Sequence, residues 1–392
     1  MAFENLWSEV SGFPAVTLEK LEIWNFRNHR HTAVNFQSWA HCITGPNGSG
    51  KSALLEAISY LCTGRGFASG QDQNYVMLGH EQEGFELHGH FRLDTLPFKI
   101  ECTYKSGVGK EFRFNGKLYG KLSDHLGRLP AVAIYPADIE MVWGYAADRR
   151  KYLDQILSFS DPNYLNVLKR YYKFLELRNA HLRQAKEARR SPDPVLLEAY
   201  AEEMGAATEI LNELRSRYVS HINEKLILFY EVLAHNNEYP YLEWHPSAPE
   251  TEKFRHELVT AYEADLRVGS TLRGPHKDEV EFRLHGQPLK KHGSQGQQKT
   301  YLIALKLAAI HMLSVKLNRK PLILLDDIFD KLDPRRVESL LQLLAEFKGQ
   351  LFISDTEPGR LFSVKGVPDM NFHIFECDAG NLRVARRTIS HV

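Results

Sequence analysis

The feature that most constrains this chain is a phosphate-binding loop near its start whose partner motifs lie near its end. The loop consists of Gly45, Pro46, Asn47, Gly48, Ser49, Gly50, Lys51 and Ser52, the pattern G-x-x-x-x-G-K-S. In such a loop the backbone N–H groups surround phosphate oxygens, the lysine neutralises β- and γ-phosphate charge, and the serine hydroxyl ligates Mg²⁺. A short apolar stretch (40–44) precedes the loop and helical spacing (53–61) follows it, so we expect residues 45–52 to bind ATP and Mg²⁺.

Two acidic residues near the end of the chain complete the predicted chemistry. Asp326 ends the apolar run 321–325, which is typical of a buried parallel strand. At that position a carboxylate can reach a metal beside Ser52; the alternative is a surface turn. Asp327 is the natural candidate to orient the attacking water. Most cassette ATPases have glutamate there, and the shorter aspartate predicts slow turnover.

The segment Ser294-Gln-Gly-Gln-Gln-Lys299 predicts a dimer. In ATPases of the ATP-binding-cassette class this element caps the nucleotide held by a second subunit. It precedes Asp326 by 32 residues, the spacing that this class requires, which argues against a helix N-cap without a ligand. We therefore expect contacts from Ser294, Gly296 and Gln297 to a partner's ATP. In the segment Lys331-Leu-Asp333, Asp333 is predicted to lie in the loop that crosses the dimer interface.

Composition adds bounds to this interpretation. Lys+Arg and Asp+Glu are both 49 among 392 residues, so any nucleic-acid surface must be a local patch. The four cysteines, isolated from one another, suggest a reducing compartment, and none of the histidines has a zinc-type spacing. No apolar run approaches 18 residues, and residues 1–15 lack the features of a signal peptide. We expect a cytoplasmic protein without membrane contacts.

The pattern predicts three parts. Residues 1–142 form the N-terminal part of an ATPase domain, with alternating strands and a hairpin turn at Asn115-Gly116. Residues 143–266 form a helical lobe, in which two heptad-patterned helices joined by Ser191-Pro-Asp-Pro194 make a short antiparallel hairpin. Residues 267–392 form the C-terminal part of the ATPase domain. The hairpin either packs within its lobe or projects as an arm that binds a partner.

The first helix of this hairpin is basic. From 149 to 190 there are 11 Lys+Arg against 4 Asp+Glu, whereas 191–220 has two basic and six acidic residues. One interpretation is ion pairing across the hairpin. The other is a phosphate-contacting surface for DNA. The residues predicted for that surface are Arg149, Arg150, Arg183, Arg189 and Arg190.

Taken together, the motifs resemble the RecF family of SMC-like cassette ATPases. The segments that carry the resemblance are Asn25-Phe-Arg-Asn28, the phosphate loop, Asp148-Arg-Arg-Lys-Tyr-Leu-Asp154, Arg178-Asn179, Gly269-Ser-Thr-Leu-Arg-Gly-Pro-His-Lys-Asp278, Ser294 to Lys299, and Leu325 to Asp333. They span residues 18–356. The resemblance implies an α/β fold, a cassette ATPase head of mixed and antiparallel sheets with an inserted α-helical hairpin lobe.

The family resemblance also implies a function and partners. It implies a recombination mediator in gap repair and replication restart, with RecR and RecO as partners. The protein would dimerise on ATP, bind double-stranded DNA and gap junctions, and release both on slow hydrolysis stimulated by DNA. Arg27 would contact nucleotide phosphate. Gln73 is expected to contact the metal or its water, with Gln71 an equal alternative, and the turn at 274–278 is expected to place His276 or Lys277 near the lobe junction or DNA.

The chain departs from the family pattern at two positions. Ala146 stands where proline is usual, and Asp355 or Thr356 stands where many cassette ATPases have a γ-phosphate-sensing histidine.

Three rival interpretations assign the chain to other classes of protein. A transporter's nucleotide-binding subunit is disfavoured because Lys51 and Ser294 are 243 positions apart. An ATPase partnered with a nuclease would need an acidic cluster that is not found, and a DNA clamp that uses ATP only as glue requires Asp327 to be a poor base.

Overall fold

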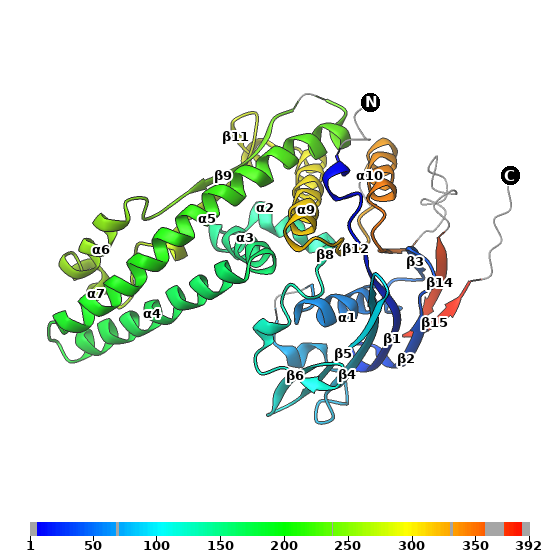
Figure 1. Cartoon of the computed structure of the whole chain (residues 1–392), viewed down its shortest axis with the longest axis horizontal. Coiled ribbons are helices and arrows are strands. Elements are labelled where there is room, and N and C mark those ends of the chain that lie inside the picture. Colours follow the sequence, from blue (N-terminus) through cyan, green and yellow to red (C-terminus); the bar gives the residue numbers. More distant parts are fainter. Residues whose placement is uncertain (1–5, 68–69, 237, 330–331, 357–371, 386–392) are drawn as a thin grey trace. The chain divides into compact units, whose positions relative to one another are not determined.

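Both ends of the chain build one unit of the structure, and the middle builds a second. The computed structural model describes residues 6–67, 70–236, 238–329, 332–356 and 372–385 (Figure 1). Unit 1 comprises residues 1–139, 228–238 and 294–392, and unit 2 comprises residues 140–227 and 239–293. The helix α5 (Pro194–Ala234) supplies residues to both units.

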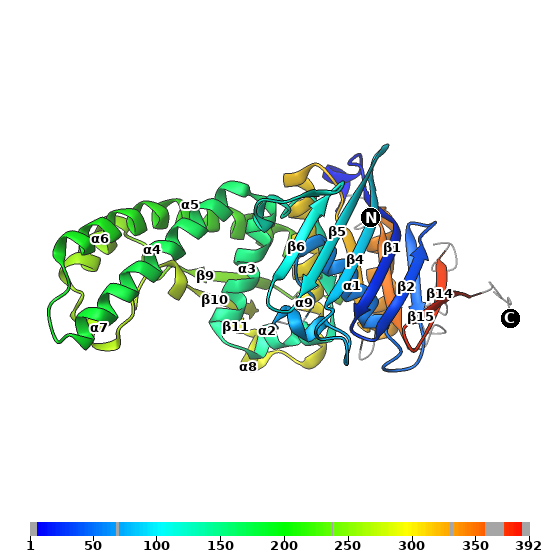
Figure 2. The same cartoon turned by 90° about the horizontal axis from the view of Figure 1, so that it is seen from below.

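Unit 1 contains an antiparallel sheet that the alternating sequence pattern predicts. Its order is β2-β1-β4-β5-β6-β7 (Figure 2). The strands are β1 (Val16–Phe26), β2 (His29–Asn35), β4 (Phe85–Leu93), β5 (Leu96–Lys105), β6 (Gly109–Phe114) and β7 (Lys117–Leu118). Asn115 and Gly116 both have positive φ, 49° and 78°, and turn β6 into β7, as the Asn-Gly signal predicts.

The second sheet of unit 1 is mainly parallel and brings distant segments together. Its order is β15-β14-β3-β13-β12-β8, and only the β14–β15 pair is antiparallel. The strands are β3 (Ala40–Thr44), β8 (Ala131–Ile134), β12 (Leu322–Asp326), β13 (Leu351–Asp355), β14 (His373–Asp378) and β15 (Asn381–Val384). Every residue of β3, β12 and β13 is buried, which explains why these strands read as continuous apolar runs.

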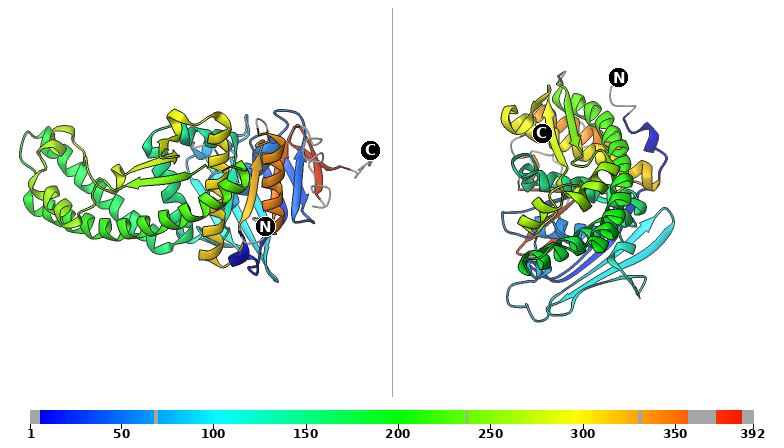
Figure 3. Two further views of the ribbon diagram at one scale, coloured as in Figure 1. Left: turned by 90° about the horizontal axis from the view of Figure 1, so that it is seen from above. Right: turned by 90° about the vertical axis from the view of Figure 1, so that its left-hand side faces the viewer.

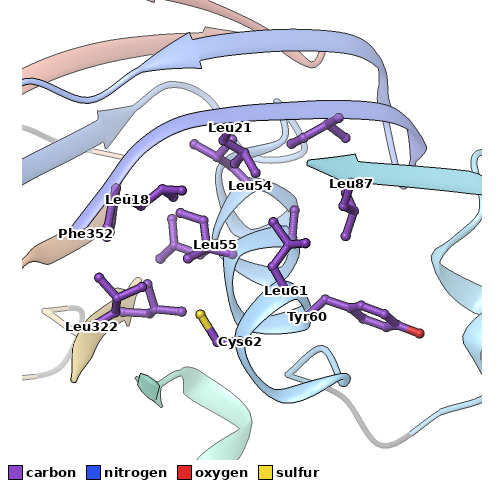
Figure 4. Packing of buried hydrophobic residues seen from close by; sticks show 14 of the residues in the cluster. Leu18, Leu21, Leu54, Leu55, Tyr60, Leu61, Cys62, Leu87, Leu322 and Phe352 are labelled. Carbon is purple, nitrogen blue, oxygen red and sulfur yellow. The ribbon is translucent and has the colours of Figure 1, made fainter. Parts of the chain in front are cut away.

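Helix α1 (Lys51–Thr63) forms much of the core of unit 1. Figure 4 shows Leu54, Leu55 and Leu61 of α1 among side chains of both sheets, including Leu87 and Phe352, in one buried cluster. The other long helices are α9 (Gln295–Leu317) and α10 (Pro334–Phe347). Among the described residues, α9 alone has the length and apolar composition of a membrane span, but 83% of that window is buried as in a core helix.

Unit 2 is built on the predicted helical hairpin. Helix α4 (Pro162–Glu187) begins at Asp161, whose carboxylate accepts hydrogen bonds from the N–H groups of Asn163 (2.8 Å) and Tyr164 (3.4 Å). Helices α4 and α5 run beside each other (Figures 1 and 3). Arg170 of α4 forms an ion pair with Glu203 of α5. The shorter helices are α2 (Glu140–Trp143), α3 (Ala146–Ser160), α6 (Thr251–Thr260), α7 (Glu263–Val268) and α8 (Leu289–His292).

The predicted boundary at residue 267 is wrong, because residues 267–293 lie in unit 2. The physical reason is strand pairing: β10 (Glu279–Leu284) pairs with β9 (Pro240–His245) and with β11 (Gln287–Pro288) in a three-stranded sheet. Helix α5 is also longer than the heptad pattern predicted. It continues to Ala234, and its last turns belong to unit 1. The predicted fold class, an α/β head with an inserted helical hairpin lobe, is confirmed.

Candidate nucleotide site and basic surface

The phosphate loop of unit 1 connects β3 to α1, as predicted. Its backbone requires glycine at two positions. Gly45 has φ +149°, and a Cβ there would lie 2.2 Å from the carbonyl oxygen of Cys377. Gly50 is the left-handed residue before α1, with φ +116°, and a Cβ there would lie 2.9 Å from the His29 Nε2 atom. The close approach of other segments therefore determines the loop shape, which leaves the N–H groups at the start of α1 available for an anion.

Lys51 and Ser52, the first two residues of α1, face this loop and the acidic end of β12. The Lys51 ammonium donates to the carbonyl oxygens of Gly45 (2.8 Å) and Pro46 (3.0 Å). The Ser52 hydroxyl donates to Asp326 Oδ1 at 2.8 Å. The structure thus joins residues that are 274 positions apart, as predicted from the sequence.

Asp326 lies at the end of β12 and receives a second hydroxyl. Ser354, from β13, donates to the same Oδ1 atom at 2.6 Å. Burial raises the pKa of the Asp326 carboxyl, while the hydrogen bonds from Ser354 and Ser52 oppose that shift. The Ser52 hydroxyl and the Asp326 carboxylate are hard oxygen donors side by side. Because Mg²⁺ usually takes one or two protein oxygens together with phosphate and water, these two residues fit Mg²⁺.

Sequence reasoning did not identify Ser354. Its pairing follows only from the parallel register, in which Asp326 lies opposite Ser354. The same residue accepts the backbone N–H of Asp327 on its hydroxyl and its carbonyl, both at 3.2 Å. Ser354 therefore orients both acidic residues.

A hollow of about 520 Å³ lies in front of the loop and has charges of both signs on its wall. The charged residues around it are Arg27, Lys51, Glu56 and Asp327. Arg27 donates to Glu56 Oε2 at 3.0 Å and to the Asn74 carbonyl at 3.0 Å. The structure thus places Arg27 beside the loop, in an ion pair that the sequence did not indicate.

The structure does not place Gln73 or Gln71 in the lining of this hollow. Gln73 is exposed in the 3-10 turn Asp72–Tyr75, and its neighbour Asn74 lines the hollow instead. Among the described residues, no group of three or more His, Cys, Asp or Glu side chains could hold a metal ion. A metal here would therefore depend on Ser52, Asp326 and the phosphates.

The Ser294 turn begins α9 and is absent from the lining of the Lys51 hollow. Ser294 is a true N-cap: its hydroxyl accepts from Gln297 N (3.2 Å), and Gln297 Oε1 accepts from Ser294 N (2.8 Å). A helix N-cap is the alternative that the 32-residue spacing to Asp326 disfavoured. The hydroxyl keeps its own proton to donate, so capping and phosphate binding are compatible.

Two residues that no motif indicated hold the Ser294 turn. Gln297 donates to Glu238 Oε1 at 2.8 Å. A Cβ on Gly296 would lie 2.8 Å from Arg336 Nη1, and Arg336 Nε is 3.1 Å from Asp333 Oδ2. Asp333 in turn is the N-cap of α10. Arg336 therefore links the Ser294 turn to Asp333. Lys331, from the same predicted segment as Asp333, lies outside the described residues.

The basic residues predicted for DNA fall into two groups in unit 2. Arg149 donates to the carbonyls of Val280 (2.5 Å) and Gly144 (3.1 Å), and burial lowers the pKa of its guanidinium. Arg150 donates to the carbonyl of Asp278 at 2.5 Å. Both are structural in this arrangement. Arg183, Arg189 and Arg190 are exposed, and within the described ranges none of them has an ion pair.

Pairing across the hairpin explains only part of the basic helix. Arg170 pairs with Glu203 on α5 at 2.5 Å. Arg178 is buried and donates to Asp265 (2.7 Å) on α7 and to Thr271 Oγ1 (2.6 Å). The charge surplus therefore belongs to the end of α4, near the turn into α5.

The turn at residues 274–278 is structural at His276 and Asp278. His276 contacts the Tyr171 hydroxyl (2.6 Å) and the Thr271 carbonyl (2.9 Å), and burial lowers its pKa to about 4. Asp278 is buried, with Arg215 at 2.6 Å and Trp244 Nε1 at 2.8 Å. Only Lys277 is exposed, so only it is available to a partner.

Comparisons with known proteins show which proteins this chain is similar to. The family described as RecF/RecN/SMC N terminal domain matches residues 17–365. The DNA replication and repair protein RecF of Cytophaga hutchinsonii is 35% identical, covering 93% of this chain and 96% of that protein. The protein of the same name from Bacteroides thetaiotaomicron is 36% identical over 93% of this chain and 97% of its own length.

Solved structures of proteins with the same name are also similar to this chain. A structure of the recombination mediator protein RecF with ATP, in the RecFOR pathway, superposes with a TM-score of 0.85 at 28% identity and covers 96% of this chain and 99% of that one. An Smc head domain from Pyrococcus furiosus has a TM-score of 0.55 at 16% identity, covering 94% of this chain and 96% of that chain, which shows a shared fold alone.

Proposed function

The chain belongs to the RecF family of SMC-like ATPases, and from this premise we propose that it is a recombination mediator that binds ATP with Mg²⁺, dimerises and binds DNA. The observation that carries the proposal is the meeting of Lys51, Ser52 and Asp326 in front of a glycine-dependent loop. The relatives named DNA replication and repair protein RecF, and the RecF structure with ATP, support the same assignment.

In this proposal residues 45–52 hold the triphosphate, with Lys51 neutralising its charge. Bound Mg²⁺ would neutralise phosphate charge between Ser52 and Asp326. Asp327, held by Ser354 through its backbone, orients the attacking water. Arg27 lies at the rim of the same hollow, where it contacts phosphate after exchanging its Glu56 partner.

The Ser294 turn supports an ATP-dependent homodimer. It belongs to unit 1 but does not line the hollow in front of Lys51, so it needs a nucleotide from elsewhere. A second copy supplies one: Ser294, Gly296 and Gln297 contact the γ-phosphate held by the partner, and Asp333 lies at the interface. Glu238 and Arg336 position this turn from behind.

The DNA assignment rests on the exposed arginines of unit 2. We propose that Arg183, Arg189 and Arg190 contact the backbone of double-stranded DNA and of gap junctions, whereas Arg149 and Arg150 support the fold. DNA-stimulated, slow hydrolysis then releases both DNA and the dimer. RecR and RecO are the proposed protein partners and the cytoplasm the proposed compartment, because the relatives that carry the RecF name are DNA-repair proteins.

Light scattering with and without ATP and Mg²⁺ tests this function on the wild type and on Asp327→Asn. We expect a monomer without ATP, a dimer with ATP, and a dimer that persists in the variant because hydrolysis is slowed. Ser294→Arg is the matched variant, since it should block dimerisation while ATP binding at Lys51 remains. A monomer under every condition would refute the composite site, and rapid turnover by the isolated wild type would refute the proposed role of DNA.

A further inference from the structure

A second hollow, of about 490 Å³, lies in unit 2 and is lined by residues of the turn between α4 and α5 and by residues of α7. In Figures 1 and 2, α7 lies beside the end of the helical hairpin that contains this turn. Four cationic side chains line it: Lys186, Arg189, Arg190 and Arg267. None of its lining residues is acidic. Two of the four, Lys186 and Arg267, were not among the residues predicted from the sequence.

Two partly buried contacts bring Arg267 to the other three residues. Arg178 of α4 donates to Asp265 of α7 at 2.7 Å, and Asn179 Oδ1 accepts from the backbone N–H of Thr271 at 2.7 Å. These bonds hold the whole segment 265–271 against α4. Gly269, with φ +83°, packs so closely that a Cβ there would lie 3.2 Å from Arg183 Cγ and 3.9 Å from Lys186 Cδ. The hollow is therefore a built feature, because the segment behind Arg267 is held to α4 through the buried residues Arg178 and Thr271.

The four cations have no ion-pair partner in the described part of the chain. Like charges at one hollow repel one another, so this arrangement does not serve folding. Helix ends account for some of it, since cations are favourable near the C-terminal carbonyls of α4 and α7. They do not account for the absence of any acidic side chain from the lining, which leaves four cations together.

The backbone at Arg189 shows how the turn after α4 is built. Arg189 has φ 52°, in the left-handed region that follows many helices and favours glycine or asparagine. Its neighbour closes the turn, with Arg190 N donating to the carbonyl of Ala185 at 3.0 Å. This turn fixes the backbone from which Arg189 and Arg190 extend into the lining of the hollow.

We propose that this hollow binds a phosphate group of nucleic acid, with Arg267 and Lys186 completing a site around Arg189 and Arg190. The proposal rests on the DNA binding proposed above and adds a fixed point of contact to it. Guanidinium groups match phosphate oxygens through paired N–H donors, and four cations at one hollow are suited to such an anion. The phosphate could come from an internal diester or from a terminal monoester at a strand end.

The test measures binding of a fluorescent duplex at several salt concentrations in the presence of ATP. Arg267→Gln and Arg189→Asn should each weaken binding by roughly tenfold, the loss typical of one charge-assisted hydrogen bond. Each should also lower the salt slope by about one. Asparagine suits the left-handed backbone at residue 189, so a loss of binding in that variant cannot be ascribed to a strained fold. Arg170→Gln is the matched control, because Arg170 is already paired with Glu203.

Two further readouts separate the alternatives. Duplexes with 5′-hydroxyl or 5′-phosphate ends distinguish the sources: equal binding assigns an internal diester, and tighter binding of the phosphorylated end, lost in Arg267→Gln, assigns a terminal monoester. Inorganic phosphate should raise the Tm of the wild type more than that of Arg267→Gln. Because both proteins retain the phosphate loop, a difference in Tm reports on the hollow at the hairpin turn. Variants that bind DNA with the affinity and salt slope of the wild type would overturn the proposal. A wild type that binds no DNA, but shows the phosphate-dependent difference in Tm, would refute the proposed function and nucleic acid as the source while supporting an anion site.

Discussion

The hollow in front of the phosphate loop and the hollow at the hairpin turn have nearly equal volumes, about 520 and 490 Å³, but they gather charge in different ways. In front of the phosphate loop, Lys51 and Arg27 stand among the acidic residues Glu56 and Asp327. The main-chain N–H groups at the start of α1 add positive potential there. At the hairpin turn, the charge comes from side chains alone and has one sign. A mixed wall suits a nucleotide that carries a divalent cation, whereas an all-cationic wall suits an anion alone.

The difference also concerns how charge is stabilised. Unit 1 holds Lys51 by two carbonyl oxygens that lie within six residues in sequence. Unit 2 buries Arg215 and Arg178 against carboxylates from other elements and leaves the cations at the hairpin turn unpaired. Local main-chain carbonyls thus hold the lysine of the first site, whereas long-range side-chain pairing holds the segment that carries Arg267 at the second. Substitutions of single charged residues should therefore have different effects in the two units.

The largest effect is expected at the buried charge of unit 2. Asp278→Ala removes the carboxylate that Arg215 and Trp244 contact and leaves a buried guanidinium with only part of its partners. Breaking such a pair costs about 3–5 kcal/mol of unfolding free energy. Thermal or urea unfolding measures it, with Glu263→Gln, an exposed carboxylate of the same unit, as the control. A loss below about 1 kcal/mol would contradict the comparison.

The next effect concerns the phosphate loop. Lys51→Gln should weaken ATP binding by about 100-fold, because it removes a positive charge from a site with acidic neighbours, a loss of about 3 kcal/mol. Titration with a fluorescent ATP analogue measures the affinity. Lys20→Gln, at a partly buried pair with Glu22 on the antiparallel sheet, is the control. Affinity within threefold of the wild type would show that main-chain donors alone carry the site.

Acidification should destabilise both units through buried histidines. Burial lowers the pKa of His125 in unit 1 and of His276 in unit 2 to about 4 each. Between about pH 6.5 and pH 4 the unfolded chain binds protons that the folded protein does not, so stability falls as pH falls. At pH 5 the expected loss is about 2 kcal/mol for each histidine. Urea midpoints at pH 7 and pH 5 measure it.

Variants sharpen that measurement. His276→Gln and His125→Gln should each reduce the pH dependence by about one proton, even though the neutral hydrogen bonds to Thr271 and Leu61 also change. Stability that is unchanged or rises on acidification would be inconsistent with neutral buried imidazoles in either unit.

The smallest effect is expected for the exposed pair across the hairpin. Arg170→Gln, which removes the partner of Glu203, should cost no more than about 0.5 kcal/mol of unfolding free energy, because solvent screens both charges. Thermal unfolding of this variant beside Glu203→Gln and the double variant gives the coupling energy. A coupling above about 1 kcal/mol would restore the view that the basic helix serves to hold the hairpin together.

Much of the head was predictable because its signals are local. The phosphate loop reads as eight contiguous residues, the apolar runs of β12 and β13 report burial on both faces, and Asn115-Gly116 specifies its turn. The failures have a common cause. The boundary at residue 267 was misplaced because β10 finds its partner β9 some 40 residues earlier, which no local pattern records. The expectation for Gln73, with Gln71 as its alternative, followed the family resemblance, whereas the structure has the neighbouring Asn74 in the lining of the hollow.

By itself, the sequence determined the phosphate loop, the acidic strand end, the heptad hairpin and the family, since each depends on residues at short, fixed spacings. Only the tertiary structure decided which charges are free. It showed Ser354 on Asp326, Arg336 between Gly296 and Asp333, and Arg267 beside Arg189. The physical reason is that a long charged side chain can reach a carbonyl, a carboxylate or solvent, and which of these it meets depends on elements brought together by folding.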